Sequence, residues 1–204
     1  MSDEPGPRRS LGRDVRDPRV LRGLAHPARS RILDEMSATG PMRAADIARE
    51  LGIPANQASF HLRQLAKYGL VEEAPGEARD RRDRVWQLVA DEGLVIRPED
   101  LAAQPGGAAA VGVWRRQALG RAHHAVDTAY LRRRDEETTT SVTDLTLRLT
   151  RAEAQQLTAE LQEILHRWTE RTRGRDTARR TYLLTQILQP HPETLTEVST
   201  GDSS

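Results

Sequence analysis

The chain has 204 residues, of which 37% are hydrophobic, 3% aromatic and 30% charged, and it contains no cysteine. This composition predicts small helical modules rather than one large core, and it excludes disulfides, thiolate metal sites and a cysteine nucleophile. The sequence has no run of 18 apolar residues and no apolar leader, so we expect a cytoplasmic protein without a membrane partner. The net charge is +1, so any polyanion binding must depend on the local placement of cations.

The N-terminal third begins with a segment that lacks periodicity. Residues 1–16 are rich in Pro, Gly, Arg and Asp, and we predict a disordered tail there. Asp17-Pro18 offers an N-cap followed by a proline at the first helical position, which predicts a helix start. A second helix is predicted from Pro27, because Ile32, Leu33 and Met36 recur at helical spacing.

Two short helices are predicted next, around a glycine-containing turn. The first covers residues 42–51, and Gly52-Ile53-Pro54 stops it. The second runs from about Ala55 to Tyr68 and ends at Gly69, a C-terminal cap. This arrangement is the helix-turn-helix signature. Residues 70–75 and 84–89 are predicted strands joined by the polar loop 76–83, and together they predict a β-hairpin wing.

The second half of the chain is predicted to be a separate unit behind a linker. Residues 91–110 are predicted to be the linker, with room for one helical turn, and residues 111–134 a long helix. Leucines alternate with polar residues over 141–150, which predicts a strand, and an amphipathic helix and a second strand are predicted at 151–172 and 181–188.

A strand–helix–strand (β-α-β) unit over 141–190 is too small to stand alone, so it must pack on the long helix, on another copy of itself, or on both. Residues 191–204 are predicted to form a second disordered tail. The fold class is therefore mainly α with small β (α+β), with a winged helix-turn-helix domain at 17–90.

Phe60 is the only phenylalanine of the chain, and it lies in a polar stretch. At about 100° per residue, Ala58, Leu62 and Leu65 share one face of the helix, and Phe60 lies almost opposite. An exposed aromatic among amides suits a surface that reads a DNA groove, because Asn and Gln can pair with adenine and an apolar group can touch the thymine methyl. The candidates for base readout are Asn56, Gln57, Ser59, Phe60 and Gln64. The alternative is that Phe60 packs against the wing or the preceding helix and reads nothing.

Cations near this helix are candidates for contacts with the DNA backbone. Arg63 and Lys67 lie on the helix itself. The wing carries Arg79, Arg81, Arg82 and Arg84, interleaved with acidic residues. At that position they would contact phosphates and the minor groove. The alternative is an ordinary solvated hairpin.

The combined motifs carry a family resemblance. LRGLAHPARSRILDEM, AADIARELGIPANQASFHLRQLAKYGLVEE and the Arg-rich hairpin resemble the ArsR-like winged helix-turn-helix transcriptional regulators over about residues 17–90. The resemblance implies a regulator, most often a repressor, that binds a double-stranded DNA operator. The last third is similar to C-terminal extensions of some such regulators.

Two departures from the ArsR-like pattern limit what the resemblance implies. The Cys-x-Cys of the metal-sensing members would fall near Arg43 and Ala45, so thiol-based metal sensing is absent. Pro54 stands where the family often has a Ser or Thr N-cap. Capping must then come from elsewhere, for example from a DNA phosphate.

A homodimer is expected, because one recognition helix reads too few base pairs for specificity. The resemblance assigns the dimer interface to the long helix, and the predicted face is Trp114, Ala118, Ala122, Ala125, Val126 and Ala129. His123 and Asp127 lie one turn apart and are weak metal candidates. Because a solvated or interface histidine pair is the preferred interpretation, no metal or cofactor is assigned. His26 and His61 are expected to be structural.

No catalytic constellation is recognisable, so an enzyme is not expected. Two alternatives to a simple DNA-binding regulator stay open. The first is a winged-helix module that binds a protein, such as a polymerase subunit, without specific DNA readout. The second makes the C-terminal unit a sensor of an unknown small-molecule effector, with Trp114, Trp168, Tyr130 or Tyr182 lining a pocket.

Overall fold

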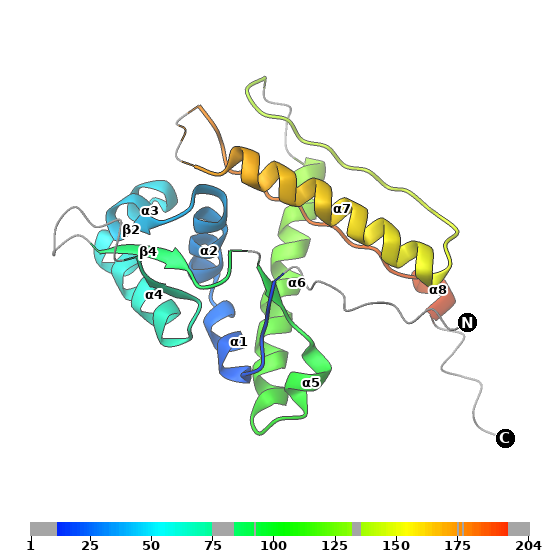
Figure 1. The fold of residues 1–204 in the computed structure, drawn as a ribbon, viewed down its shortest axis with the longest axis horizontal. Helices are drawn as coiled ribbons and strands as arrows, with labels where there is room; N and C mark the ends of the chain where they lie inside the picture. The colour runs from blue at the N-terminus through cyan, green and yellow to red at the C-terminus, as the bar shows by residue number, and fades with distance from the viewer. Residues whose placement is uncertain are drawn as a thin grey trace, which may run out of the picture. The chain divides into compact units, whose positions relative to one another are not determined.

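The structure, a computed structural model, describes residues 12–74, 84–91, 93–131, 136–174, 176 and 178–195. Helices dominate it, and the strands are short (Figure 1). The helices are α1 (Pro18–Leu24), α2 (Pro27–Thr39), α3 (Ala44–Leu51), α4 (Ala55–Lys67), α5 (Pro98–Ala102), α6 (Gly107–Leu131), α7 (Arg151–Thr172) and α8 (Pro192–Leu195). The strands are β1 (Arg13–Asp14), β2 (Met42–Arg43), β3 (Val71–Glu73), β4 (Val85–Leu88) and β5 (Leu94–Val95). The fold class, mainly α with small β, is confirmed.

The first core lies between α2, α3, α4 and a small sheet. Its buried members come from the predicted inner faces, and they are Ile32, Met36, Met42, Ile47, Leu51, Ala58, Leu62, Leu65, Leu70, Val71 and Trp86. Helices α3 and α4 are joined through Gly52, whose φ of 64° is left-handed and therefore favours glycine. The predicted pair of short helices around a turn is thus present.

The sheet beside this core has the strand order β2-β4-β3, and both pairings are antiparallel. Val71 lies opposite Leu88, and Glu73 lies opposite Trp86. Strands β3 and β4 are the two strands predicted for the wing hairpin. The predicted loop 76–83 between them lies outside the described residues.

A second, smaller core corrects two predictions. Leu21, Leu101, Ala110 and Val111 are buried together, with Val15, Leu24, Ile96, Ala102 and Trp114 packed against them. The segment 91–110, predicted to be a linker, supplies β5, α5 and the start of α6 to this core. Of the predicted tail 1–16, residues 13–15 are held by a parallel pairing of β1 with β5, and residues 1–11 lie outside the described part.

Specific contacts explain why these two segments are ordered. The backbone N–H of Val15 donates to the oxygen of Val95 at 3.0 Å, and an ion pair joins Arg97 to Asp14 at 2.6 Å. Helix α6 begins at Gly107, four residues earlier than predicted, because an alanine run of strong helix-forming residues follows. Of the predicted helix 111–134, residues 132–134 lie outside the described part.

The C-terminal unit, formed within residues 128–171 and 182–204, keeps its helix but not its strands. Helix α7 matches the predicted range 151–172, and it starts at a reciprocal cap in which Glu153 and Thr150 exchange hydrogen bonds. The predicted strands at 141–150 and 181–188 are not formed among the described residues. A strand needs a neighbouring strand to accept its backbone hydrogen bonds, and the two segments do not pair with each other.

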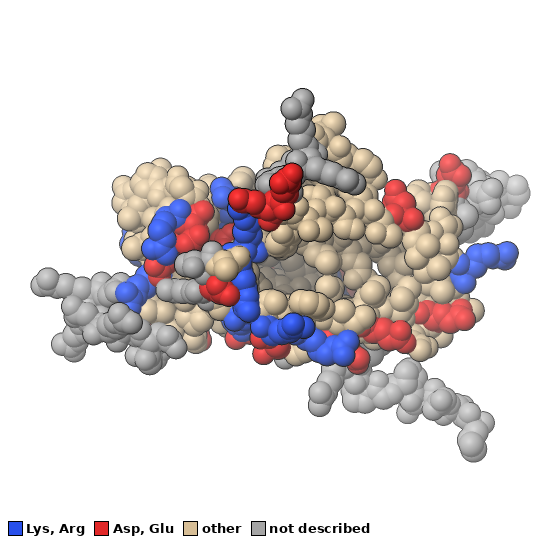
Figure 2. All heavy atoms as spheres, turned by 90° about the horizontal axis from the view of Figure 1, so that it is seen from above, with Lys and Arg blue, Asp and Glu red and all other residues tan. Residues whose placement is uncertain are grey.

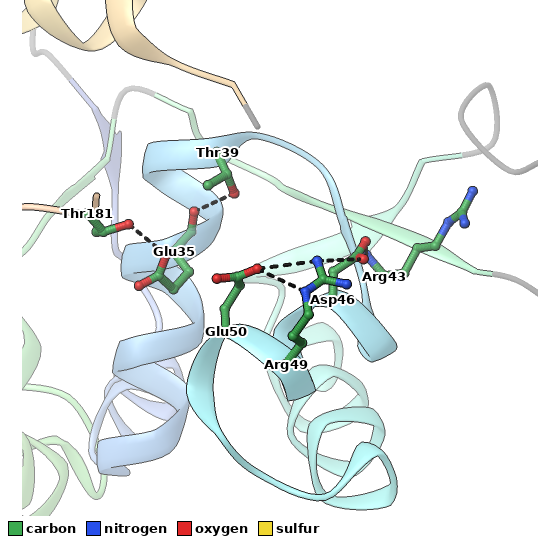
Figure 3. A network of polar contacts seen from close by, with 7 residues as sticks. All are labelled: Glu35, Thr39, Arg43, Asp46, Arg49, Glu50 and Thr181. Carbon is green, nitrogen blue, oxygen red and sulfur yellow. Dashed lines mark hydrogen bonds and ion pairs between the residues drawn. The ribbon is translucent and has the colours of Figure 1, made fainter. Parts of the chain in front are cut away.

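The segment after α7 belongs to the first unit, together with residues up to 127. Arg173 forms an ion pair with Asp91 at 2.7 Å. The hydroxyl of Thr181 donates to the carboxylate of Glu35 on α2 at 2.8 Å (Figure 3). Residues 172–181 are therefore attached to the unit that contains α2.

Candidate nucleic-acid interface

Helix α4 is anchored by one face and presents the opposite face to solvent. Ala58, Leu62 and Leu65 are 0% exposed, whereas the Phe60 side chain is 51% exposed. The orientation predicted from the helical pitch is therefore confirmed. An aromatic side chain that is left half exposed in a chain with so few aromatics is available to a partner.

The polar side chains around Phe60 are available to different degrees. Asn56 and Gln57 are exposed, and Ser59 and Gln64 are half-buried. The Oδ1 atom of Asn56 accepts the backbone N–H of Gln57 at 2.9 Å, so Asn56 has its amide N–H₂ group and one lone pair left for a base. The side-chain amide of Gln57 is also exposed.

The start of α4 has no side-chain cap. Pro54 occupies the N-cap position, as the sequence indicates, and its carbonyl oxygen accepts the N–H groups of Gln57 and Ala58 at 3.0 and 3.1 Å. The first turn contains no acidic residue. The positive end of the helix dipole is therefore not neutralised by a carboxylate of that turn, which suits the approach of a phosphate.

The predicted backbone-contacting cations are only partly within the described residues. Arg63 and Lys67 are exposed on α4. Arg84 is exposed and forms an ion pair with Glu73 across the base of the hairpin at 2.9 Å. Arg79, Arg81 and Arg82 lie outside the described residues. Figure 2 shows basic and acidic side chains interspersed on the face that it presents, in keeping with the net charge of +1.

The arginine of α3 is occupied by neighbouring acids. Arg49 forms ion pairs with Asp46 and Glu50, both at 3.3 Å, and Asp46 also accepts the backbone N–H of Arg43 at 3.4 Å (Figure 3). A cation that already has two carboxylate partners gains less from a phosphate. The α3 surface is therefore a weaker candidate for DNA contact than the α4 surface.

A histidine pair lies next to Phe60, and of its two members His61 is buried and His26 is exposed. The rings of His26 and His61 are 4.8 Å apart, and the ring of His61 also meets Phe60 edge-on at 5.6 Å. His26 is the N-cap of α2, and its Nδ1 accepts the N–H of Ala28 at 3.2 Å. The structural role expected for both residues agrees with these contacts. The pair itself could not be read from the sequence, because the two histidines are 35 positions apart.

This pair predicts a loss of stability in acid. Burial lowers the pKa of both histidines below the usual 6.5, and Arg29 lowers both further. A lowered pKa means that the unfolded chain binds more protons than the folded chain below about pH 6.5. The contribution of the two neutral histidines to the free energy of unfolding is therefore complete above about pH 6.5 and decreases as the pH falls below it. Urea denaturation from pH 7.5 to pH 5 measures this decrease.

The control for the acid effect is His26→Asn. Asparagine also accepts a hydrogen bond at the N-cap position but does not titrate in this range, so the pH dependence should become shallower while stability at pH 7.5 changes little. An unchanged slope would show that other groups cause the acid sensitivity.

The predicted dimer face on α6 is only partly free. Trp114 packs against the second core of its own chain, whereas Ala118, Ala122, Ala125 and Ala129 are half-buried and Val126 is 54% exposed. Arg121 of α6 forms an ion pair with Asp34 of α2 at 3.1 Å. His123 and Asp127 are exposed, and the described residues contain no group of three or more potential metal ligands.

The aromatic residues considered for an effector site do not line the cavity found in the first unit. This cavity of about 200 Å³ is lined by residues of α1, of the α5–α6 turn and of the start of α6, namely Asp17, Pro18, Arg19, Arg22, Gln104, Pro105, Gly106 and Ala110. Tyr130, Trp168 and Tyr182 are more than half exposed. An effector site at these aromatics stays a prediction.

Comparison with known proteins finds a family match in the N-terminal part of the chain. Residues 24–74, which hold α2, α3, α4 and β3, match a family described as a helix-turn-helix domain. The segment is similar to helix-turn-helix domains. With its β3–β4 hairpin it has the winged form, and this supports a DNA-binding transcription regulator.

Other comparisons add little to the helix-turn-helix assignment. No curated protein matches the chain. A crystal structure of a MarR mutant from E. coli has 18% identity and a TM-score of 0.33, and the match covers 74% of this chain and 88% of that one. A structure of disulfide-formed AbfR has 13% identity and a TM-score of 0.25, with coverage of 55% and 82%. Both TM-scores are too low to guide an assignment.

None of the described helices is long and apolar enough to cross a membrane.

Proposed function

We propose that the protein is a homodimeric, sequence-specific DNA-binding transcription regulator that acts as a repressor on a double-stranded operator. The observation that carries this proposal is the half-exposed Phe60 on a helix whose opposite face is fully buried. The helix-turn-helix match and the likeness of residues 17–90 to ArsR-like regulators support it.

In the proposed complex, the exposed face of α4 enters the major groove. An α-helix fits this groove, and each base pair presents there a distinct pattern of donors, acceptors and methyl groups. Gln57 would pair with an adenine edge, and Phe60 would contact a thymine methyl. Asn56, Ser59 and Gln64 flank these two residues and would complete the readout.

Cations on both sides of this face would contact the phosphates. Arg63 and Lys67 project from α4 itself, and the wing would add Arg79, Arg81, Arg82 and Arg84. Arg84 would have to share its charge between a phosphate and Glu73. The acidic residues between the wing arginines would weaken binding to random DNA, which favours specificity.

The proposed dimer places two α4 helices on two half-sites about 34 Å apart, one turn of DNA. Helix α6 would supply part of the interface through Ala118, Ala122, Ala125, Val126 and Ala129. Small side chains allow the two helices to approach closely, and Val126 would gain burial.

The salt dependence of binding tests the proposed function. The affinity for random duplex DNA should fall linearly with salt on logarithmic axes, and Arg63→Ala should make that slope shallower by about one unit. Arg116→Ala, which removes an exposed arginine of α6 outside the domain, should leave the slope unchanged. A wild-type protein without salt-dependent DNA binding would instead favour a winged-helix module that binds a protein.

A further inference from the structure

Among the described residues, a strongly exposed apolar segment covers residues 182–188, C-terminal to α7. All five of its large apolar side chains are between 43% and 72% exposed, and they are Tyr182, Leu183, Leu184, Ile187 and Leu188. Segments with these properties aggregate unless something covers them. A folded protein that carries this segment therefore needs an occupant for it.

The backbone of this segment indicates what kind of occupant fits. In the part of the chain that the structure describes, no backbone hydrogen bond involves residues 182–188. Unpaired N–H and C=O groups in an extended segment are a template on which another strand can pair, and a helix cannot supply that ladder. The occupant is therefore expected to be a strand.

The side chains indicate an interior position in a sheet. If the segment is extended, Tyr182, Leu184 and Leu188 point to one side, and Leu183 and Ile187 point to the other. Both faces are thus apolar, which is typical of a central strand that is covered on both sides. Residues 143–149 differ, because their leucines alternate with Thr and Arg and give only one apolar face.

The charges favour the same segment of a second copy as the occupant. Residues 181–190 contain no charged side chain, so pairing with an identical strand brings no like charges together. Arg179 and Arg180 precede the segment, and Glu193 follows it. Antiparallel pairing brings the basic end of one copy toward the acidic end of the other, whereas parallel pairing would place arginine beside arginine.

We propose that two copies of the chain pair through residues 182–188 as antiparallel strands across a two-fold axis near Thr185. Leu183 then lies opposite Ile187 of the second copy and Tyr182 lies opposite Leu188, so that these cross-strand pairs are apolar, and Leu184 lies opposite Gln186. The five side chains would bury on the order of 500 Å² of surface per copy. Together with the α6 contact, this approaches the roughly 800 Å² per copy that a stable interface buries. This inference rests on the homodimer of the proposed function and assigns it a second interface.

Cysteine cross-linking tests the strand pairing, because the chain has no cysteine of its own. Thr185→Cys places a cysteine on the proposed two-fold axis, whereas Gln186→Cys faces Leu184 of the second copy, and both residues are exposed, so little effect on folding is expected. Residues that face their own copies lie about 4.5–5.5 Å apart between Cα atoms, which a disulfide can span. The matched control is Glu163→Cys on the exposed surface of α7.

With the oxidant diamide, Thr185→Cys should form a disulfide-linked dimer at least tenfold faster than the Glu163→Cys control, and faster than Gln186→Cys. Ile187→Lys, which brings charge into the pairing, should weaken the dimer at least tenfold in sedimentation equilibrium. The proposal is overturned if Thr185→Cys does not exceed the control, as expected if the segment pairs within its own chain or binds another protein. DNA is absent from this experiment, so its failure leaves the salt-dependence test of the proposed function intact.

Discussion

Replacing Leu62 by alanine is expected to destabilise the helix-turn-helix domain by about 2–5 kcal/mol. Leu62 is 0% exposed and lies on the face of α4 that packs against the domain core, so the substitution removes buried methyl groups and leaves a cavity. Urea denaturation followed by circular dichroism measures the change in the free energy of unfolding.

The matched control is Phe60→Ala, two positions away on the same helix. Because Phe60 is half exposed, its truncation should cost about 1 kcal/mol or less despite the larger change in volume. The ranking matters more than either value. A larger loss for Phe60→Ala than for Leu62→Ala would show that α4 is turned the other way.

Replacing Gly107 by alanine is expected to disrupt the packing of α6 on α5. A Cβ atom at this position would overlap the backbone oxygen of Leu101, and backbone cannot move aside as a flexible side chain can. Overpacking of this kind costs on the order of 1–3 kcal/mol, and a clash with backbone belongs at the upper end. The same denaturation experiment measures the loss.

Gly120→Ala is the control for this substitution, because it makes the same change further along α6. No atom lies within 4 Å of a Cβ at Gly120, so alanine should stabilise the helix by up to about 1 kcal/mol through its higher propensity. If both glycine variants have the same effect, residues 91–110 would be a linker and not a part of the second core.

The helix-turn-helix part could be predicted from the sequence because its signals are local. Ala58, Leu62 and Leu65 recur within two turns, so the helical pitch alone places Phe60 on the opposite side. Gly52 and Gly69 mark helix ends through their backbone freedom. Such signals extend over a few residues and do not depend on the rest of the chain.

The second core could not be predicted because its contacts join distant parts of the chain. Strands β1 and β5 have two residues each, and their partners are about 80 positions apart, so neither shows a usable alternation. The segment 91–110 contains Pro and Gly residues that are typical of a linker. Leu101 is nevertheless buried against Leu21, which sequence spacing cannot indicate.

The C-terminal strands show the opposite case, in which a local pattern was present and the pairing was not. The leucines of 145–149 alternate as in a strand, yet they are 39–74% exposed. Alternation indicates that one face of a strand is suited to burial. It does not indicate whether the same chain provides a partner strand. The pattern is satisfied only when another strand is available.

The binding of folded Phe60→Ala to DNA tests the central claim, that the exposed face of α4 reads the major groove. The operator fragment is first found by footprinting the protein on its own promoter, and affinities for this fragment and for random duplex are then compared at one salt concentration. We expect Phe60→Ala to weaken operator binding by about 1–3 kcal/mol, roughly 5- to 150-fold, with little change for random DNA. An equal loss on both DNAs, or no loss on either, would contradict the claim.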